Sequence, residues 1–592
     1  MPTVYFYETQ KAVPAEAGSS LLSILQKTGV SINAPCGGKG RCGKCSVDIL
    51  EHSGAACTWR TVSACQYCIS GDLTVKLPRQ EDTSILTSGS SASLPGRLPD
   101  PVVYSVVADI PRCQIGEASS EADRVRQILG ENIQIPLSVS AQMFPMLDAL
   151  DYHADFVICE NMLLDIRSQD SPFYLLAYDI GTTTVVCYLL DGKTGRQLTA
   201  VSCLNPQTAY GADVISRCEF AVSDGEELTL TACLRSALSE LAQSAAEQCR
   251  ISMNDIYLAV ATGNTCMQHL YLGISPASLL HAPYNATISD RVSLSAAACG
   301  LPIHPNGRLI FLPVIAGFVG ADTTGVLLSL PPDTFQQLTL VLDIGTNGEL
   351  VLGNERELIT CSTAAGPAFE GAKITFGMRG CTGAVDHVQL TGNELSLHII
   401  GSDRNPDIIP EGICGSGLLD LIYVLLRMGI VSRRGRLERP EKWQPELKEK
   451  YDHRFVRRDN SNAFLLTDDP DGIYLSQKDI RELQLAKAAI ATGIELLCQT
   501  LEVTADQIQS VLLAGAFGSF MSAESACGIG LIPGQLQDRI TVIGNAAGEG
   551  AKYAALSRSA LARGDRIARE IRFLELAASK QFQDTYFRRL DF

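Results

Sequence analysis

The chain has 592 residues, a formal net charge of −17 and a hydrophobic content of 46%, which is typical of a globular protein with several cores. This acidic balance argues against a general surface for nucleic acid or anionic membranes, because both need clustered Lys and Arg. The sequence shows no secretion signal and no apolar run near the ~20 residues of a membrane-spanning helix. We therefore expect a cytoplasmic protein.

The first 79 residues predict a small β-grasp domain. Residues 3–7 and 72–77 have the pattern of strands, and residues 19–27 have the period of an amphipathic helix. A C-x5-C-x2-C motif lies between these elements, and a fourth cysteine follows after nineteen further residues.

Four closely spaced cysteines indicate a redox centre. Iron-sulfur clusters need four thiolates that converge on the irons, and the glycines of this motif let a short loop wrap a cluster. The five-residue first gap resembles that of the adrenodoxin-like ferredoxins. We expect a [2Fe-2S] cluster whose ligands are Cys36, Cys42, Cys45 and Cys65.

Two alternatives remain open for these cysteines. Cys57 or Cys68 could replace Cys65 as the fourth ligand of the cluster. Cys65 and Cys68 also form a near-knuckle, so Cys42, Cys45, Cys65 and Cys68 could hold zinc instead. Zinc leaves the glycine-rich loop and Cys36 unexplained. The other cysteines of the 20 lie mostly in apolar stretches, where we expect buried thiols.

The next two segments carry no chemical motif. Residues 80–101 are rich in Ser, Pro and Gly, which predicts a flexible linker that would let the cluster domain move between electron donor and acceptor. A spacer without a mechanical role is the alternative. Residues 102–171 contain a strand-like stretch at 102–110 and a helical one at 122–129, and we expect a small middle domain there.

Two similar loops then predict a nucleotide site. Each follows an apolar strand, contains Asp-Ile-Gly-Thr and leads into another strand, which indicates a hairpin with a tight turn. Such a turn can offer N–H and hydroxyl donors to phosphate, while its aspartate can hold magnesium through water. The residues expected to bind are Asp179, Gly181, Thr182, Thr183 and Thr184 in the first loop, and Asp343, Gly345, Thr346, Asn347 and Gly348 in the second.

The spacing of the two aspartates, 343 minus 179 or 164 positions, resembles the duplicated α/β fold shared by sugar kinases, heat-shock ATPases and actin. Residues 172–592 would form this domain, and two ordinary β-turns are the alternative. Further glycine-rich turns fit the order of such a site. The first two precede helix-like sequence, where a helix N-terminus can face anionic groups. They contain Gly366, then Gly415, Ser416 and Gly417, and a third turn contains Gly515 and Gly518.

Seven motifs resemble one family in particular, the reductive activators of corrinoid-dependent methyltransfer proteins. They run through nearly all of residues 172–555, and the order of ferredoxin domain, linker, small domain and ATPase core is the family's order. Gly380 to Gly383 and the charged stretch 433–460 depart from the family's pattern. The motifs are Asn205-Pro-Gln207-Thr-Ala-Tyr210-Gly211-Ala-Asp213-Val-Ile-Ser216-Arg217, Gly263-Asn264-Thr265, Phe318-Val-Gly320-Ala-Asp322-Thr323, Gly366-Pro-Ala-Phe-Glu370-Gly371-Ala-Lys373, Gly377-Met378-Arg379, Gln477-Lys-Asp-Ile-Arg481 and Gly544-Asn545-Ala-Ala-Gly548.

The resemblance implies an ATP-dependent reductase with a [2Fe-2S] cluster, ATP and Mg²⁺. It would reduce the Co(II) of an inactive corrinoid protein to Co(I), with a corrinoid protein and a low-potential electron donor as partners. Ferredoxin-like clusters lie near about −400 mV, and cobalt reduction lies lower, so ATP would have to assist. The corrinoid protein could belong to an O-demethylase, methylamine or acetyl-CoA system, and a homodimer is a candidate oligomeric state.

Two other function classes stay open. One is a small-molecule kinase of the same fold with a redox-sensing ferredoxin domain, in which Asp213 and Asp322 are candidate bases. The other is a non-enzymatic, redox-responsive binding protein.

Overall fold

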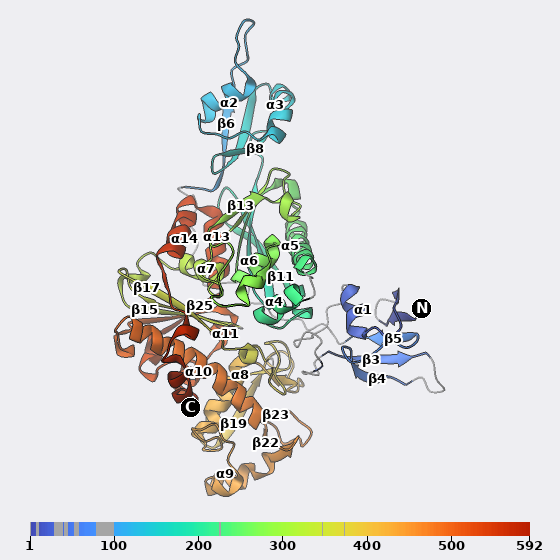
Figure 1. The fold of residues 1–592 in the computed structure, drawn as a ribbon, viewed down its shortest axis with the longest axis vertical. Coiled ribbons are helices and arrows are strands. Elements are labelled where there is room, and N and C mark those ends of the chain that lie inside the picture. The colour runs from blue at the N-terminus through green and yellow to red at the C-terminus, as the bar shows by residue number, and fades with distance from the viewer. Residues whose placement is uncertain are drawn as a thin grey trace.

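The computed structural model describes residues 2–7, 11–28, 40, 45–52, 58–77, 100–223, 227–345, 347–371 and 373–592, and Figure 1 shows their arrangement. The ligand candidates Cys36, Cys42 and Cys57, the linker 80–99 and Thr346 lie outside the described residues. In the described part of the chain, none of the helices combines the length and the apolar character needed to cross a bilayer.

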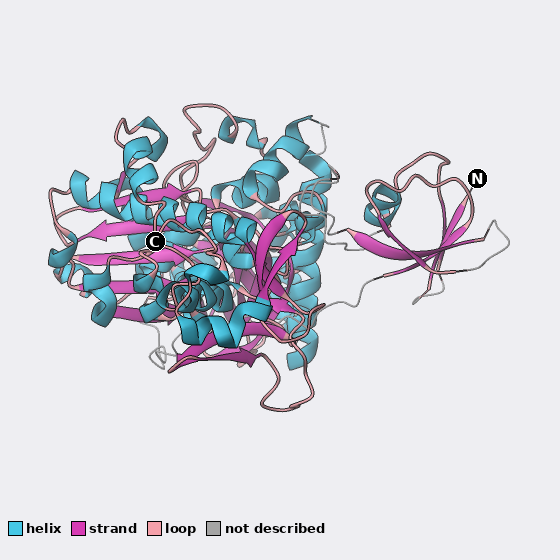
Figure 2. Cartoon of the chain, turned by 90° about the horizontal axis from the view of Figure 1, so that it is seen from below, coloured by secondary structure: helices cyan, strands magenta, loops and turns pink. Residues whose placement is uncertain are grey.

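The N-terminal sheet has five strands in the order β2-β1-β5-β3-β4, with β1 and β5 parallel. Helix α1 (Leu21–Lys27) packs on this sheet through Leu21 and Leu25, which join Val47 and Val75 in the core. This is the β-grasp arrangement that the sequence predicts. Figures 1 and 2 show the sheet standing apart from the rest of the described chain. Its strands are β1 (Thr3–Phe6), β2 (Ala12–Pro14), β3 (Ser46–Glu51), β4 (Arg60–Ser63) and β5 (Leu73–Lys76).

A three-stranded sheet follows, in the order β6-β7-β8. Phe156 packs with Leu147 under its helices, while Val157 belongs to the core of the neighbouring large sheet. A buried ion pair of 3.0 Å between Arg167 and Asp155 lies near this junction, where Arg167 also donates to the carbonyls of residues 171 and 172. The elements are β6 (Val103–Asp109), α2 (Glu121–Leu129), α3 (Leu137–Ala149), β7 (His153–Cys159) and β8 (Met162–Arg167).

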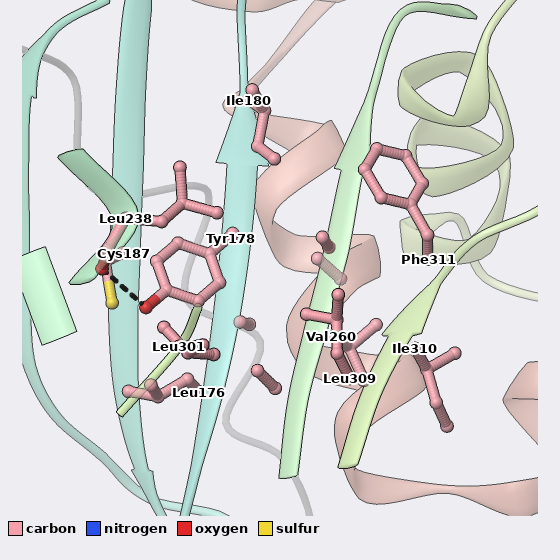
Figure 3. Packing of buried hydrophobic residues seen from close by; sticks show 14 of the residues in the cluster. Leu176, Tyr178, Ile180, Cys187, Leu238, Val260, Leu301, Leu309, Ile310 and Phe311 are labelled. Carbon is pink, nitrogen blue, oxygen red and sulfur yellow. Dashed lines mark hydrogen bonds between the residues drawn. The ribbon is translucent and has the colours of Figure 1, made fainter. Parts of the chain in front are cut away.

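The first large sheet has the order β11-β10-β9-β12-β14-β13. Its central strands are apolar on both faces because helices cover them, and Figure 3 shows Tyr178, Val260 and Phe311 in the resulting core. The Tyr178 hydroxyl donates to the carbonyl of Leu238 at 3.0 Å. The elements are β9 (Tyr174–Ile180), β10 (Thr184–Asp191), β11 (Gln197–Leu204), α4 (Val214–Ser223), α5 (Glu227–Cys249), β12 (Ile256–Gly263), α6 (Thr265–Leu272), β13 (Val292–Ser295), β14 (Arg308–Phe311) and α7 (Ala321–Ser329).

The second large sheet, β25-β24-β15-β16-β17-β26, repeats the first. In each sheet a hairpin (β9 and β10, or β15 and β16) carries a third antiparallel strand on one side and parallel strands on the other. This is the duplicated α/β fold that the sequence predicts. The strands are β15 (Thr339–Ile344), β16 (Gly348–Gly353), β17 (Leu358–Thr363), β24 (Ser510–Ala514), β25 (Ile540–Gly544) and β26 (Arg572–Phe573).

Two small sheets and several helices extend the second half. The charged stretch 433–460 is not a loose loop, because Trp443 and Tyr451 are buried against Phe464. The elements are β18 (Ala384–Thr391), β19 (Glu394–Ile399), β20 (Gly412–Ile413), α8 (Gly415–Arg427), α9 (Pro445–Tyr451), β21 (Phe455–Arg458), β22 (Ser461–Leu465), β23 (Tyr474–Ser476), α10 (Gln477–Thr500), α11 (Gly515–Phe520), α12 (Ala523–Gly528), α13 (Ala546–Leu556), α14 (Arg558–Glu570) and α15 (Phe582–Arg588).

Helices α7 and α13 connect the two halves. They cross in direct backbone contact, because a Cβ at Gly550 would collide with the carbonyl oxygen of Gly325 and a Cβ at Gly325 would lie 2.9 Å from the carbonyl oxygen of Ala547. Helix α13 begins after β25 of the second sheet but packs on β9 and β12 of the first. The halves therefore pack tightly against each other where these two helices cross.

This crossing gives the first prediction. We expect Gly550→Ala to destabilise the protein by ~1–3 kcal/mol, because the added methyl group forces two helix backbones apart. Thermal or urea unfolding measures the change. Gly534→Ala is the matched control, because a Cβ at Gly534 meets nothing within 4 Å. If Gly550→Ala and Gly534→Ala unfolded at the same temperature or urea concentration, the close contact between α7 and α13 would be contradicted.

Candidate functional site

The two aspartates predicted to bind magnesium end equivalent strands. Asp179 lies at the end of β9 and Asp343 at the end of β15. Burial raises the pKa of Asp179 to about 6, and burial together with Asp322 and Asp179 raises the pKa of Asp343 to about 7. The two loops therefore face a common point, although 164 positions (343 minus 179) separate their aspartates.

Two further acids complete a carboxylate cluster, by which we mean Asp179, Asp322, Asp343 and Glu349. Asp322 lies in the first turn of α7, and burial raises its pKa to about 6. Glu349 lies in β16, and burial followed by repulsion from Asp322 and Asp343 raises its pKa well above the usual range. All four side chains are only partly exposed. Carboxylate oxygens are the ligands that a hard divalent cation prefers, and these four side chains are close enough to influence one another's charge.

The first loop is a tight turn between β9 and β10. The Gly181 N–H donates to the Thr184 carbonyl at 2.9 Å. The Thr182 hydroxyl accepts from Asn264 at 2.9 Å, and the Thr183 hydroxyl donates to Glu370 at 2.9 Å. Glu370 comes from the second half of the fold. The loop therefore contacts both halves.

The second loop has a similar turn, in which the Gly345 N–H donates to the Asn347 carbonyl at 2.9 Å. Gly348 begins β16 and pairs with Ile344. The glycine-rich turn after β24 reaches this loop. Gly515 has φ +85°, and a Cβ there would lie 2.6 Å from a carboxylate oxygen of Asp343. Gly518 lies within the short helix α11 that follows.

Gly415, Ser416 and Gly417 form the first turn of α8, as the sequence predicts, and all three are buried. Gly415 is packed against the carbonyl of Phe369, where no Cβ would fit. This turn of the helix is therefore seated on the 367–370 segment.

The prediction of a helix after Gly366 is wrong. One 3-10 turn, Pro367–Glu370, follows Gly366 and no helix continues from it. Gly371 ends the turn with φ +76°, and a Cβ there would lie 2.6 Å from the backbone of Met378. Close packing of the chain on itself thus replaces the helix.

Several residues of the site were not identified as binding residues from the sequence. Asp322 was considered only as a kinase base, and Glu349 and Asn545 had no assigned role. Asn545 caps α13, donates to the Tyr188 hydroxyl at 3.1 Å and hydrogen-bonds Asp179. The sequence signal that could have identified Asn545 is its position at the start of a helix directly after β25. Asp322 likewise lies at the start of a helix, α7.

The described part of the cluster site is a pair of thiols. Cys45 directly precedes β3 and Cys65 closely follows β4, and their sulfur atoms are 3.3 Å apart. Two thiolates ~2.3 Å from one tetrahedral metal ion would be ~3.8 Å apart, so the pair fits a shared ion. Cys68, the alternative ligand, is exposed. Among the described residues no three His, Cys, Asp or Glu side chains converge closely enough to hold a metal ion by themselves, so neither this thiol pair nor the carboxylate cluster is a complete metal site.

The fold and these two sites define an iron-sulfur protein joined to a nucleotide-binding protein of the actin and sugar-kinase type. Family models match a 2Fe-2S iron-sulfur cluster binding domain at residues 6–70, the RACo middle region at 174–331 and the C-terminal ASKHA domain of RACo at 337–592. The corrinoid activation enzyme RamQ of Eubacterium limosum is 34% identical over 98% of both chains.

A second relative is the Co(II) methylated amine-specific corrinoid protein reductase of Methanosarcina barkeri, which is 24% identical over 70% of this chain and 76% of its own length. The solved structure of a reductive activator for corrinoid, iron-sulfur protein has a TM-score of 0.74 and 29% identity, and covers 100% of this chain and 98% of that one. The chain belongs to the family of reductive activators of corrinoid proteins.

The thiol pair gives the second prediction. We expect Cys65→Ser to abolish the visible absorption of the [2Fe-2S] cluster, because one of four thiolates is lost. Cys68→Ser, a change of the same size three residues away, should leave the spectrum of anaerobically purified protein intact. The reverse result would make Cys68 the fourth ligand, and zinc without iron in metal analysis would refute the cluster.

The carboxylate cluster gives the third prediction. An aspartate with a pKa of about 7 in the folded protein and ~3.9 in the unfolded chain stabilises less as pH rises from 4 to 7, because the unfolded chain gives up its proton first. We expect Asp343→Asn to raise the melting temperature above that of wild type by an amount that grows over this range and then levels off.

The measurement uses thermal unfolding from pH 4 to pH 8 with a chelator present, so that no divalent cation offsets the repulsion. Asp333→Asn, at an exposed position, controls for the loss of one carboxylate. A variant that melts below wild type at pH 8 would show that Asp343 is stabilising in the charged form.

Proposed function

We propose that this protein uses ATP to reduce the cobalt of a corrinoid protein from Co(II) to Co(I). The observation that carries the proposal is the meeting of two equivalent Asp-Ile-Gly loops at one carboxylate cluster, in a chain that also pairs Cys45 with Cys65. The names of RamQ and of the methylated amine-specific reductase support the corrinoid partner. When bound, the [2Fe-2S] cluster supplies one electron per cobalt and is itself oxidised.

The loop residues would bind ATP as a magnesium complex. With pKa values of about 6 for Asp179 and about 7 for Asp343, much of the carboxylate cluster is ionised at neutral pH and repels a free phosphate. A divalent cation held by these two side chains removes that repulsion. Within the loops 181–184 and 345–348, the hydroxyl groups and the N–H groups of Thr182 and Thr183 would then bind the nucleotide. The residues around it would be Gly366, Gly415, Ser416, Gly417, Gly515 and Gly518.

Nucleotide can assist electron transfer only by favouring one conformation of the two halves over another. Each half contributes two carboxylates to the cluster, Asp179 and Asp322 from the first half and Asp343 and Glu349 from the second. In addition, Thr183 of the first half donates to Glu370 of the second. ATP bound between the loops would therefore set the angle of the α7–α13 crossing. We propose that this angle controls docking or release of the corrinoid protein.

The proposal also names the compartment, the electron donor, the remaining ligands and the oligomeric state. The described cysteines form no disulfide with one another, which suits a reducing compartment such as the cytoplasm. A low-potential donor must reduce the cluster after each turnover. Cys36 and Cys42 are proposed as the remaining cluster ligands, and Mg²⁺ as the cation of the carboxylate cluster. A homodimer stays the candidate oligomeric state.

The fourth prediction tests the function directly. Reduced protein is mixed without oxygen with a Co(II) corrinoid protein, and visible absorption follows the formation of Co(I) with and without MgATP. We expect ATP to accelerate the reaction and Asp179→Asn to slow the ATP-dependent rate by about 10²-fold, because the cation and phosphates lose their alignment.

Glu355→Gln, which changes an exposed carboxylate in the connection between β16 and β17, is the matched control and should react as wild type. An ATP-independent rate would refute nucleotide control. Phosphorylation of a small metabolite by protein that lacks its cluster would favour the kinase instead.

A further inference from the structure

The motif at residues 205–217 lies directly against the first phosphate loop and has no assigned role. The side-chain amide of Asn205 donates to the Gly181 carbonyl at 2.8 Å, and its backbone N–H donates to the Thr183 carbonyl at 2.8 Å. The carbonyl between them, that of Thr182, accepts from the guanidinium of Arg217. Three successive carbonyls of the loop are thus bound by one motif.

Bonding of these carbonyls fixes the direction of the loop's N–H groups. In a planar trans peptide the C=O of one residue and the N–H of the next point in opposite directions. Because the carbonyls of Gly181 and Thr182 point at Asn205 and Arg217, the N–H groups of Thr182 and Thr183 point away from them. Neither of these two N–H groups has an acceptor among the residues that the structure describes. Successive free N–H groups on one side of a turn form an anion-binding nest.

Arg217 also brings a charge to the loop. Its side chain is completely buried, and within the described residues it forms no ion pair with a carboxylate. Its other N–H groups donate to the Gly211 carbonyl at 2.9 Å and to the Gln207 side chain at 3.4 Å, and Gln207 is itself anchored to the Leu230 carbonyl. Burial lowers the pKa of Arg217 only to about 10, so it stays charged at neutral pH.

A buried charge without a carboxylate partner costs several kcal/mol unless another group compensates it. Carbonyl dipoles compensate Arg217 in part. Glu370, whose carboxylate accepts from Thr183, and Asp213 lie close enough to favour the charged form. An anion on the other side of the loop would complete the compensation without touching the guanidinium.

We propose that Asn205 and Arg217 are positioning residues for the phosphates of a nucleoside di- or triphosphate, and that Arg217 is their buried counter-charge. Asn205 and Arg217 hold the loop so that its N–H groups face the phosphates, and the guanidinium attracts the phosphates through the loop. The inference rests on the proposed function, because it takes the 181–184 loop to be a phosphate site.

The fifth prediction uses the full-length protein with its cluster. Calorimetry measures binding of MgATP, MgADP and adenosine to wild type and to Arg217→Gln. We expect the affinity for both nucleotides to fall at least tenfold and the affinity for adenosine to change less than twofold. Arg217→Lys, which keeps the charge but not the fork of donors, should lie between Arg217→Gln and wild type.

Arg563→Gln is the matched control. Arg563 also donates to two main-chain carbonyls, those of Leu327 and Leu330, but it belongs to α14 and does not contact the loop. This variant should bind all three ligands as wild type does.

Each of the following outcomes counts against either the inference or the proposed function. Nucleotide binding by Arg217→Gln within twofold of wild type would overturn the role of Arg217, and equal losses for ATP and adenosine would reduce that role to general stability. If Arg217→Lys and Arg217→Gln bound nucleotide equally weakly, the role of Arg217 as a counter-charge would be overturned. A wild-type protein that binds no nucleotide would refute the proposed function instead.

A measurement on the wild-type protein tests the inference even if the Arg217 variants fail to fold. Hydrogen exchange should show the 178–185 segment protected by MgADP and not by adenosine, because only phosphate gives the Thr182 and Thr183 amides an acceptor. Protection by neither ligand would overturn the orientation of the loop.

Discussion

Repulsion between carboxylates that come from different halves of the fold is the constraint on which the rest of the structure depends. Asp179 and Asp343 each end a central strand, where the carboxyl end of the sheet directs them outward, and each raises the cost of ionising the other. Two like charges held by separate sheets push the sheets apart. In the proposed function a cation between them would reverse this force, and the halves would move about the tight crossing of α7 and α13.

The sequence predicts most of this site because its signals are local. An apolar strand that leads through Asp-Ile-Gly-Thr into a second strand indicates a hairpin wherever it occurs, and both hairpins are present. The cysteine spacing also predicts that Cys45 and Cys65 belong to one site, and the structure brings them together through the pairing of β3 with β4, two strands that the sequence analysis does not predict. The roles of Asp322 and Glu349 could not be predicted, because a residue at a helix start and a residue within a strand face the cluster only after the two sheets have packed together. The helix expected after Gly366 fails for a related reason, as the contact of Gly371 with Met378 is tertiary.

The buried polar motif shows how the first loop can be rigid without being rich in glycine. Its residues 182–184 are all threonine, whose branched side chains restrict the backbone, and Asn205 and Arg217 bind the carbonyls that would otherwise seek water. The second loop has Asn347 and Gly348 at the matching positions and contacts Gly515 instead. The duplicated halves therefore reach a similar turn by different means, one through a buried side-chain network and the other through close backbone packing.

Opposite charges on the two sides of the first loop make the site selective. Under the proposed function, the carboxylate cluster would repel a bare phosphate, whereas Arg217, on the other side of the loop's backbone, would attract it. A ligand that carries both a divalent cation and phosphates satisfies both sides together, whereas either component alone leaves one charge uncompensated. Under the proposed function, the electrostatics would thus favour a nucleotide that carries its divalent cation over free phosphate or free metal. Because the two halves share the cluster, the ligand that satisfies the charges would also bring the halves together.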